Sequence, residues 1–181
     1  MPVIRRGLAL GLGIAAALVS VAAQANDKIV SELRLGVFAH DQGIFSSHKE
    51  SGVDINGEIL FSDLGWLGKR VMLRPHIGGT VNSDGNTSDG YFGLTATLPF
   101  AQRFFVEGSV GGAVHTGNLE SNELGHKDLG CRVLFRESLS LGVMIDEHNS
   151  LAAVADHISN ANLCDKNEGL EDVGVRYGYR F

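Results

Sequence analysis

Several residue types that mark familiar protein classes are scarce in this chain. Two cysteines are too few for a disulfide-rich scaffold or a four-cysteine zinc site. Three prolines and the absence of a Gly-X-Y period exclude collagen and Gly/Pro low-complexity sequence. After residue 25 there is no run of 18 apolar residues, so no spanning helix is predicted there. Acidic residues outnumber basic residues by 21 to 15, which argues against a general nucleic-acid-binding protein.

Glycine, in contrast, is abundant. The chain has 24 glycines in 181 residues, about twice the usual share. Its mean hydropathy of +0.06 shows no bulk apolar excess of the kind that a helical membrane protein has. The length predicts a single domain, and no linker or internal repeat divides the sequence.

The first 25 residues have the three parts of a secretory signal peptide. Two arginines precede an apolar stretch over residues 8–22, and Ala23-Gln24-Ala25 supplies a cleavage site. An N-terminal membrane anchor is the alternative, but the apolar stretch is shorter than the ~20 residues that a spanning helix needs. The sequence therefore predicts a signal peptide at 1–25 and one domain at 26–181.

Beyond the signal peptide, apolar and polar residues alternate. Successive side chains of a strand point to opposite faces, so this period of two predicts β-strands. The predicted strands lie at about 33–37, 53–61, 71–77, 92–98, 104–110, 129–145, 151–159 and 173–181. The polar faces carry charges of both signs: Glu32, Arg34, Asp54, Glu58, Arg74, Glu107, Arg132, Arg136, Asp156, Arg176 and Arg180.

Two all-β architectures fit this alternation. A soluble sandwich turns its charged faces to water, whereas a membrane barrel turns its apolar faces to lipid and its polar faces inward. The signal peptide, the even strand number and the last strand, which ends in Tyr-Gly-Tyr-Arg-Phe, favour the barrel. We therefore predict an eight-stranded antiparallel transmembrane β-barrel of the bacterial outer membrane. Inward glycines would leave room for arginine side chains, and outer loops are expected near 40–52, 82–89, 115–126 and 160–170.

A base and a nucleophile lie close together on the seventh predicted strand. His157 and Ser159 are two residues apart, so both side chains point the same way, with Cα atoms about 6.5 Å apart. An imidazole can bridge that distance to a hydroxyl group and activate it. Taken alone, a His-x-Ser pair at a strand end is common by chance.

The neighbouring residues make the pattern more specific. The runs 156–161, 167–171 and 176–181 resemble the PagL family of outer-membrane lipid A 3-O-deacylases. The His-x-Ser-Asn-Ala element, the downstream Asn-x-Gly and a glutamate twelve residues after the serine are all present. The resemblance is clearest over roughly 128–181. It implies an outer-membrane serine esterase that removes the 3-O-linked acyl chain of lipid A.

The resemblance also implies a role for each matching residue. Ser159 is the nucleophile, His157 the general base and Glu171 the acid that orients His157, as in a catalytic triad. Asn160 and Asn167 match positions that support the oxyanion hole. The implied partners are lipopolysaccharide as substrate and the outer-membrane lipids. No cofactor, metal or nucleic acid is implied, and a homodimer is left open.

Two other acids compete with Glu171 as the partner of His157. The parity of Asp156 points it into the barrel, where we expect a charge partner, and family spacing disfavours Glu168. The same parity places His157, Ser159 and Glu171 together on the lipid-facing side.

Other questions stay open at this level. Cys131 and Cys164 form either a disulfide or two free thiols. Glu137 breaks the apolar parity of its strand, and a local bulge is the expected reason. A phospholipase and a non-catalytic structural or lipid-binding barrel are the alternative functions.

Overall fold

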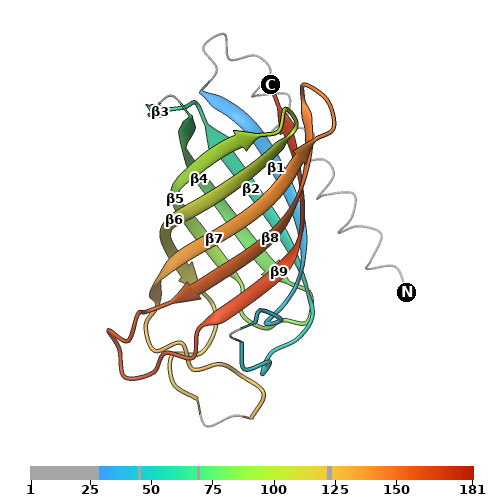
Figure 1. Cartoon of the computed structure of the whole chain (residues 1–181). Helices are drawn as coiled ribbons and strands as arrows, with labels where there is room; N and C mark the ends of the chain where they lie inside the picture. Colours follow the sequence, from blue (N-terminus) through green and yellow to red (C-terminus); the bar gives the residue numbers. More distant parts are fainter. Residues whose placement is uncertain (1–28, 45, 69, 122–123) are drawn as a thin grey trace, which may run out of the picture.

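The computed structural model describes residues 29–44, 46–68, 70–121 and 124–181 (Figure 1). The predicted signal peptide lies outside the described residues. The strands are β1 (Val30–Ala39), β2 (Val53–Phe61), β3 (Gly65–Leu67), β4 (Val71–Asn82), β5 (Asp89–Phe100), β6 (Phe104–His115), β7 (Val133–Met144), β8 (Asn149–Ser159) and β9 (Leu170–Arg180). In the described part of the chain, no helix is long and apolar enough to cross a membrane.

The strands close into a barrel in which each neighbour is antiparallel. The hydrogen-bonded order runs β2-β1-β9-β8-β7-β6-β5-β4, and β2 also pairs with β4, which closes the ring. The short β3 is an addition on β4, within the connection that follows β2. Eight long strands therefore form the wall, which confirms the predicted fold class.

The two ends of the barrel differ. The C-terminus lies at the same end as the short turns 101–103 and 145–148 (Figure 1). The connections 40–52, 83–88, 116–132 and 160–169 gather at the opposite end. In outer-membrane barrels the longer loops face the cell exterior, so we refer to this end as the outer end.

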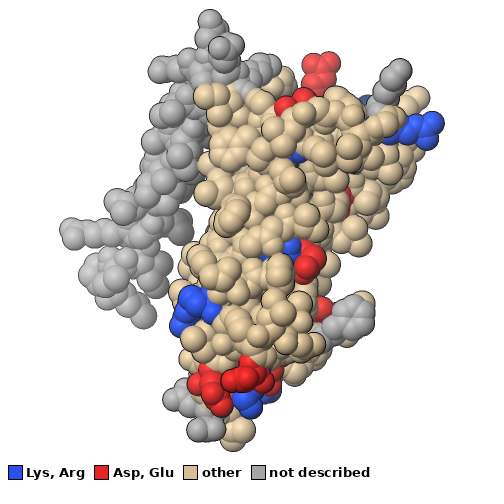
Figure 2. Space-filling view, turned by 90° about the vertical axis from the view of Figure 1, so that its left-hand side faces the viewer, with Lys and Arg blue, Asp and Glu red and all other residues tan. Residues whose placement is uncertain are grey.

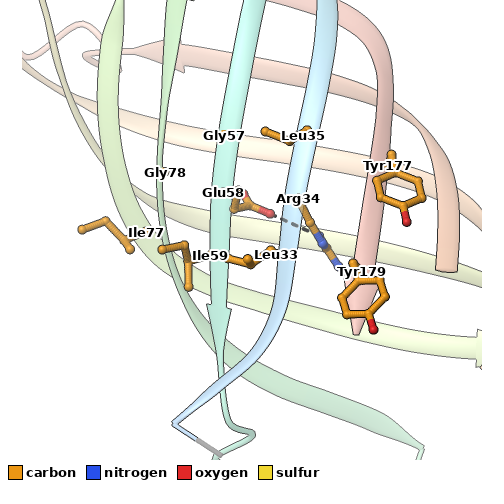
Figure 3. A pocket seen from close by; sticks show the side chains of 10 residues that line it. All are labelled: Leu33, Arg34, Leu35, Gly57, Glu58, Ile59, Ile77, Gly78, Tyr177 and Tyr179. Carbon is orange, nitrogen blue, oxygen red and sulfur yellow. Dashed lines mark hydrogen bonds and ion pairs between the residues drawn. The ribbon is translucent and has the colours of Figure 1, made fainter. Parts of the chain in front are cut away.

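The polar faces of the strands form a paired interior. Arg34 contacts Glu32, Glu58 and Glu107 at 2.6, 3.2 and 2.8 Å, and all four side chains are almost fully buried. Figure 3 shows Arg34 turned toward Glu58, while the alternate residues of β1 carry leucines. Pairing offsets the large cost of removing these charges from water.

The outer surface has the opposite character. On the face shown in Figure 2, most of the surface is uncharged and the charged side chains gather mostly toward the two ends. Leu139 and Phe92, for example, expose 62% and 68% of their area on the outside of the wall. This inside-out arrangement is typical of a barrel whose wall contacts lipid.

Several inward glycines make room for aromatic rings rather than for the predicted arginines. A Cβ on Gly142 would lie 2.1 Å from the Phe105 ring, and one on Gly78 would lie 2.5 Å from Tyr91. The Arg136 guanidinium stacks over the Tyr91 ring, with its Cζ 3.6 Å from the ring centre. At these two positions glycine leaves space for an aromatic ring, and beside Gly78 it is this ring, not the glycine, that contacts an arginine side chain.

One predicted strand begins in the wrong place. The sixth was expected from residue 129, but β7 begins at Val133. Leu129 is buried in the preceding loop, where its N–H donates to the Asn118 carbonyl. Arg132, predicted to point into the barrel, is exposed and donates to the carbonyls of His115 and Gly117. The residues before Val133 therefore belong to a loop, and their apolar and polar alternation does not mark a strand.

Candidate active site

His157 and Glu171 lie opposite each other on neighbouring strands. The register of β8 and β9 pairs these two residues directly. His157 Nδ1 is 3.3 Å from Glu171 Oε1, but the two atoms do not form a regular hydrogen bond. Such contacts in ligand-free enzymes commonly tighten when substrate binds. The geometry suits a carboxylate that orients an imidazole.

Ser159 lies at the end of β8, two residues beyond His157. Ser159 pairs with Phe135 of β7. The burial pattern of β8 places His157 and Ser159 among the residues that face outward. The His157 side chain is 37% exposed, whereas Glu171 is 11% exposed. The structure therefore places the three predicted catalytic residues together at the outer end, on the outside of the wall.

Two loop glycines pack directly against this pair. Gly43 donates its N–H to the Glu171 carbonyl at 3.3 Å, and a Cβ there would lie 1.9 Å from Glu171 Oε2. Gly169 has a φ of +64°, and its Cβ would lie 3.1 Å from His157 Cε1. Both positions bring backbone close to the side chain of a candidate catalytic residue, which requires glycine. Sequence analysis missed Gly43 because no local pattern links it to a strand more than a hundred residues away.

A groove of about 390 Å³ opens beside His157 and Glu171. Its lining combines these two residues and other polar residues, Glu137 among them, with apolar residues of the outer wall, including Leu139, Ala155 and Val173. Ile44, which is 90% exposed, contributes an edge from the first loop. The groove therefore joins His157 and Glu171 to the apolar surface of the barrel.

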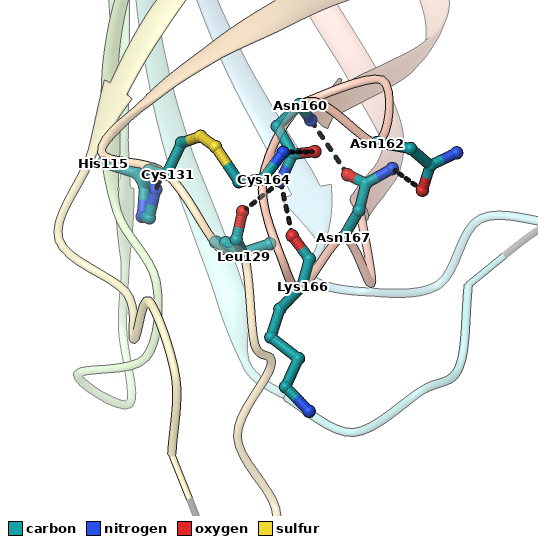
Figure 4. The surroundings of a disulfide bond; sticks show 8 residues. All are labelled: His115, Leu129, Cys131, Asn160, Asn162, Cys164, Lys166 and Asn167. Carbon is teal, nitrogen blue, oxygen red and sulfur yellow. Dashed lines mark hydrogen bonds between the residues drawn. A yellow bond between two sulfur atoms is a disulfide. The ribbon is translucent and has the colours of Figure 1, made fainter.

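The loop after Ser159 is held firmly to the segment before β7 (Figure 4). The Asn160 side chain donates to the carbonyls of Leu129 and Lys166 at 2.8 and 2.5 Å, and its backbone N–H donates to Asn167 Oδ1 at 2.9 Å. Asn167 Nδ2 donates to Asn162 at 3.1 Å.

A disulfide adds a covalent link to this loop. It joins Cys131 to Cys164, whose Cα atoms are 6.1 Å apart. Of the two states left open by the sequence, the structure therefore has the disulfide. The link and the Asn160 hydrogen bonds fix the chain that leaves Ser159.

Lys127 is a completely buried cation that ties three loops together. Its ammonium group is 2.7 Å from Asp41, 3.0 Å from Ser46 Oγ and 2.6 Å from the Gly169 carbonyl. Gly169 is the residue that packs on the His157 ring. Lys127 thus connects the first and third long loops to the backbone beneath the imidazole, a role that its sequence position did not predict.

A second ionic cluster lies beside Glu171. His40 is fully buried, and its ring nitrogens lie 2.8 Å from Asp54 and 3.0 Å from Glu50. Burial alone would lower the pKa of His40, but hydrogen bonds that its ring donates to the Asp54 and Glu50 carboxylates raise this pKa to about 10. Burial tends to raise the pKa of Glu50, but hydrogen bonds from His40 and nearby N–H groups lower it to about 2. His40, Asp54 and Asp172 have the spacing of metal ligands, but a charged imidazole already pairs with these carboxylates.

The two competing acids are engaged elsewhere. Asp156 is ion-paired to Arg136, as predicted from its inward parity. Glu168 pairs with Lys49 and accepts the Asp128 N–H at 2.7 Å. Of the three acids that the sequence offered as partners of His157, Glu171 is therefore the one that the structure brings to His157 Nδ1.

Much of the sequence is similar to a known protein family. The family described as "Lipid A 3-O-deacylase (PagL)" matches residues 66–180, more than half of the chain. The chain belongs to the PagL family. A curated member, Lipid A deacylase PagL of Bordetella bronchiseptica (strain ATCC BAA-588 / NCTC 13252 / RB50), is 27% identical over 118 residues. That alignment covers 62% of this PagL-family chain and 64% of the relative.

Solved structures agree on the fold. A crystal structure described as the outer membrane enzyme PagL superimposes with a TM-score of 0.66 at 20% identity, covering 83% of this chain and all of that one. A designed transmembrane β-barrel gives 0.51 at 9% identity and covers 84% of this chain and 96% of that one. This PagL-family chain is an outer-membrane β-barrel.

Proposed function

We propose that this chain is a lipid A 3-O-deacylase, a serine esterase that acts in the outer leaflet. The observation that carries the proposal is the cross-strand contact of His157 with Glu171, at 3.3 Å, with Ser159 two residues farther along the same face. The family description and the name of the curated relative support lipid A as the substrate and the 3-O ester as the bond.

The proposed chemistry begins at Ser159. Glu171 next to Nδ1 of His157 favours the tautomer with the proton on that nitrogen, which leaves Nε2 as the base. As the Ser159 hydroxyl attacks the acyl carbonyl carbon, Nε2 accepts the hydroxyl proton and a C–O bond forms. Collapse of the tetrahedral intermediate breaks the ester, and His157 returns the proton to the departing sugar oxygen.

Water completes the cycle. His157 takes a proton from water as the water attacks the acyl-serine. Collapse then releases the fatty acid and restores the Ser159 hydroxyl with that proton. The products are one free hydroxyacyl chain and lipid A with a free hydroxyl group, and no cofactor enters either half of the reaction.

Asn167 and Asn160 have different roles at the oxyanion in this proposal. Asn167 Nδ2 has a hydrogen bond to Asn162, a contact at the exposed surface that substrate can displace. The Asn160 amide is buried and committed to two carbonyls, so it supports the loop. We assign Asn167 as the side-chain donor to the oxyanion and Asn160 as the residue that positions it.

Mass spectrometry of lipid A tests the proposal. Cells whose lipid A retains its 3-O acyl chain would express the wild type, Ser159→Ala, or Ser62→Ala as a control at the far end of the barrel. We expect loss of one hydroxyacyl chain with the wild type and the control only. Unchanged lipid A with released phospholipid fatty acids would support a phospholipase, and no change in either lipid would support a non-catalytic barrel.

A further inference from the structure

Glu137 occupies a position on the outer wall where an apolar residue is expected. The predicted explanation, a local bulge, is wrong: β7 keeps an unbroken register with both β6 and β8. The burial pattern of β7 puts Glu137 in the outward set with Phe135 and Leu139, which are 48% and 62% exposed. The carboxylate therefore faces the surroundings by regular strand geometry.

Glu137 is also the cross-strand neighbour of the proposed general base. The register pairs Glu137 of β7 with His157 of β8, and His157 with Glu171 of β9. Directly opposed residues have Cβ atoms about 4.5–5.5 Å apart. A single row across three strands thus places the imidazole between two carboxylates, and Glu137 and His157 line the same groove.

The two carboxylates differ in their surroundings. Glu171 lies beneath the first loop and near His157 Nδ1, whereas Glu137 is exposed and makes no hydrogen bond or ion pair with the described residues. An acidic side chain on the lipid-facing wall destabilises a membrane barrel, so an unpaired one calls for a functional reason. A carboxylate accepts hydrogen bonds and repels anions, so its partner carries donor groups.

We propose that Glu137 is a substrate-binding residue that accepts hydrogen bonds from the hydroxyl or amide N–H groups of the acylated sugar beside the ester that is cleaved. The inference rests on the proposed deacylase function and specifies how its substrate is oriented. The hydrogen-bond donor groups of the sugar therefore lie against β7. The phosphate groups of the substrate point away from this side because Glu137 repels them. Glu171 remains the acid that orients His157.

Kinetics of Glu137 variants test the proposal, with purified lipid A in detergent micelles. Glu137→Leu restores the apolar pattern but removes the acceptor, and Glu137→Gln keeps one. We expect KM to rise about tenfold or more for Glu137→Leu and less for Glu137→Gln, with kcat and the pH profile little changed. Leu141→Gln, on the same face of β7 but outside the groove lining, is the matched control and should behave as wild type.

Binding to inactive protein separates this proposal from the catalytic one. In a Ser159→Ala background, Glu137→Leu should weaken lipid A binding by the same factor as KM rises. Unchanged KM and binding would overturn the proposal, as would a fall in kcat with a shifted pH profile at constant KM, since Glu137 would then act through His157. If wild type releases no acyl chain while Glu137→Leu still weakens binding, the deacylase proposal fails and the binding role stands.

Discussion

Gly43 offers a way to displace the proposed catalytic acid without changing any reacting group. An alanine Cβ at this position would lie 1.9 Å from Glu171 Oε2 and 2.2 Å from Glu171 Cβ. Carbon atoms in contact are normally about 3.5–4.0 Å apart, so Gly43→Ala must move the Glu171 side chain or the loop by more than ~1 Å. A misplacement of ~1 Å in an active site can cost about 10²-fold in rate. We therefore expect kcat of Gly43→Ala to fall about 10²-fold.

The assay is release of hydroxyacyl chains from lipid A by purified protein in detergent micelles. Gly108→Ala is the matched control, because a Cβ there would meet no atom within 4 Å and the residue lies on the exposed side of β6. The electrophoretic shift between heated and unheated samples reports whether each barrel is folded. If folded Gly43→Ala keeps kcat within about threefold of Gly108→Ala, Glu171 does not need its observed position, and its assigned role is wrong.

Three further predictions concern the outer loops. Lys127→Met should reduce activity strongly, because it leaves the buried Asp41 carboxylate without its cation, at a cost of ~3–5 kcal/mol. The double variant with Asp41→Asn should recover much of the lost activity. No recovery would contradict the ion-pair role of Lys127. Cys131→Ser should increase protease cleavage of loop 160–169 in folded protein, and equal cleavage would show that the hydrogen bonds suffice. His40, with its pKa raised to about 10, stabilises loop 40–52 fully below its ordinary pKa of 6.5, and this contribution is lost as the pH rises through about 10. Protease cleavage of that loop should therefore accelerate above about pH 10 in wild type, whereas His40→Gln should be cleaved rapidly already at pH 8. A wild-type cleavage rate that does not change with pH would refute the role of His40.

Strand parity predicted much of the barrel and the face of the candidate site. It worked because a period of two fixes which side each residue of a regular strand occupies. His157, Ser159 and Glu171 could therefore be placed outward from the sequence, and Asp156 inward, without knowing the register. Parity gave a wrong strand boundary before Val133. Leu129 fits the apolar positions of the predicted strand, but it belongs to the preceding loop.

The contacts that support the site could not be predicted in the same way. Lys127 contacts Asp41 and the Gly169 carbonyl, partners separated from it by dozens of residues in opposite directions. Gly43 reaches Glu171 only because the first loop crosses the end of β9. Loop conformations carry no periodic signal, so such contacts depend on the closed tertiary structure.

Glu137 illustrates a third case, in which the residue was noticed but its meaning was not. Its parity is plain in the sequence, but only the register shows that it lies opposite His157. A one-residue shift between β7 and β8 would have turned one of them away from the other's face. The register therefore converts an apparent irregularity into part of the candidate site.

Labelling with a serine-reactive phosphonate ester, followed by peptide mass spectrometry, tests the assignment of the nucleophile most directly. We expect a single adduct on Ser159, loss of lipid A deacylation in proportion to labelling, and little labelling when His157 is replaced by glutamine. Inactivation with the adduct on another residue, or full deacylase activity in Ser159→Ala, would contradict the proposed site.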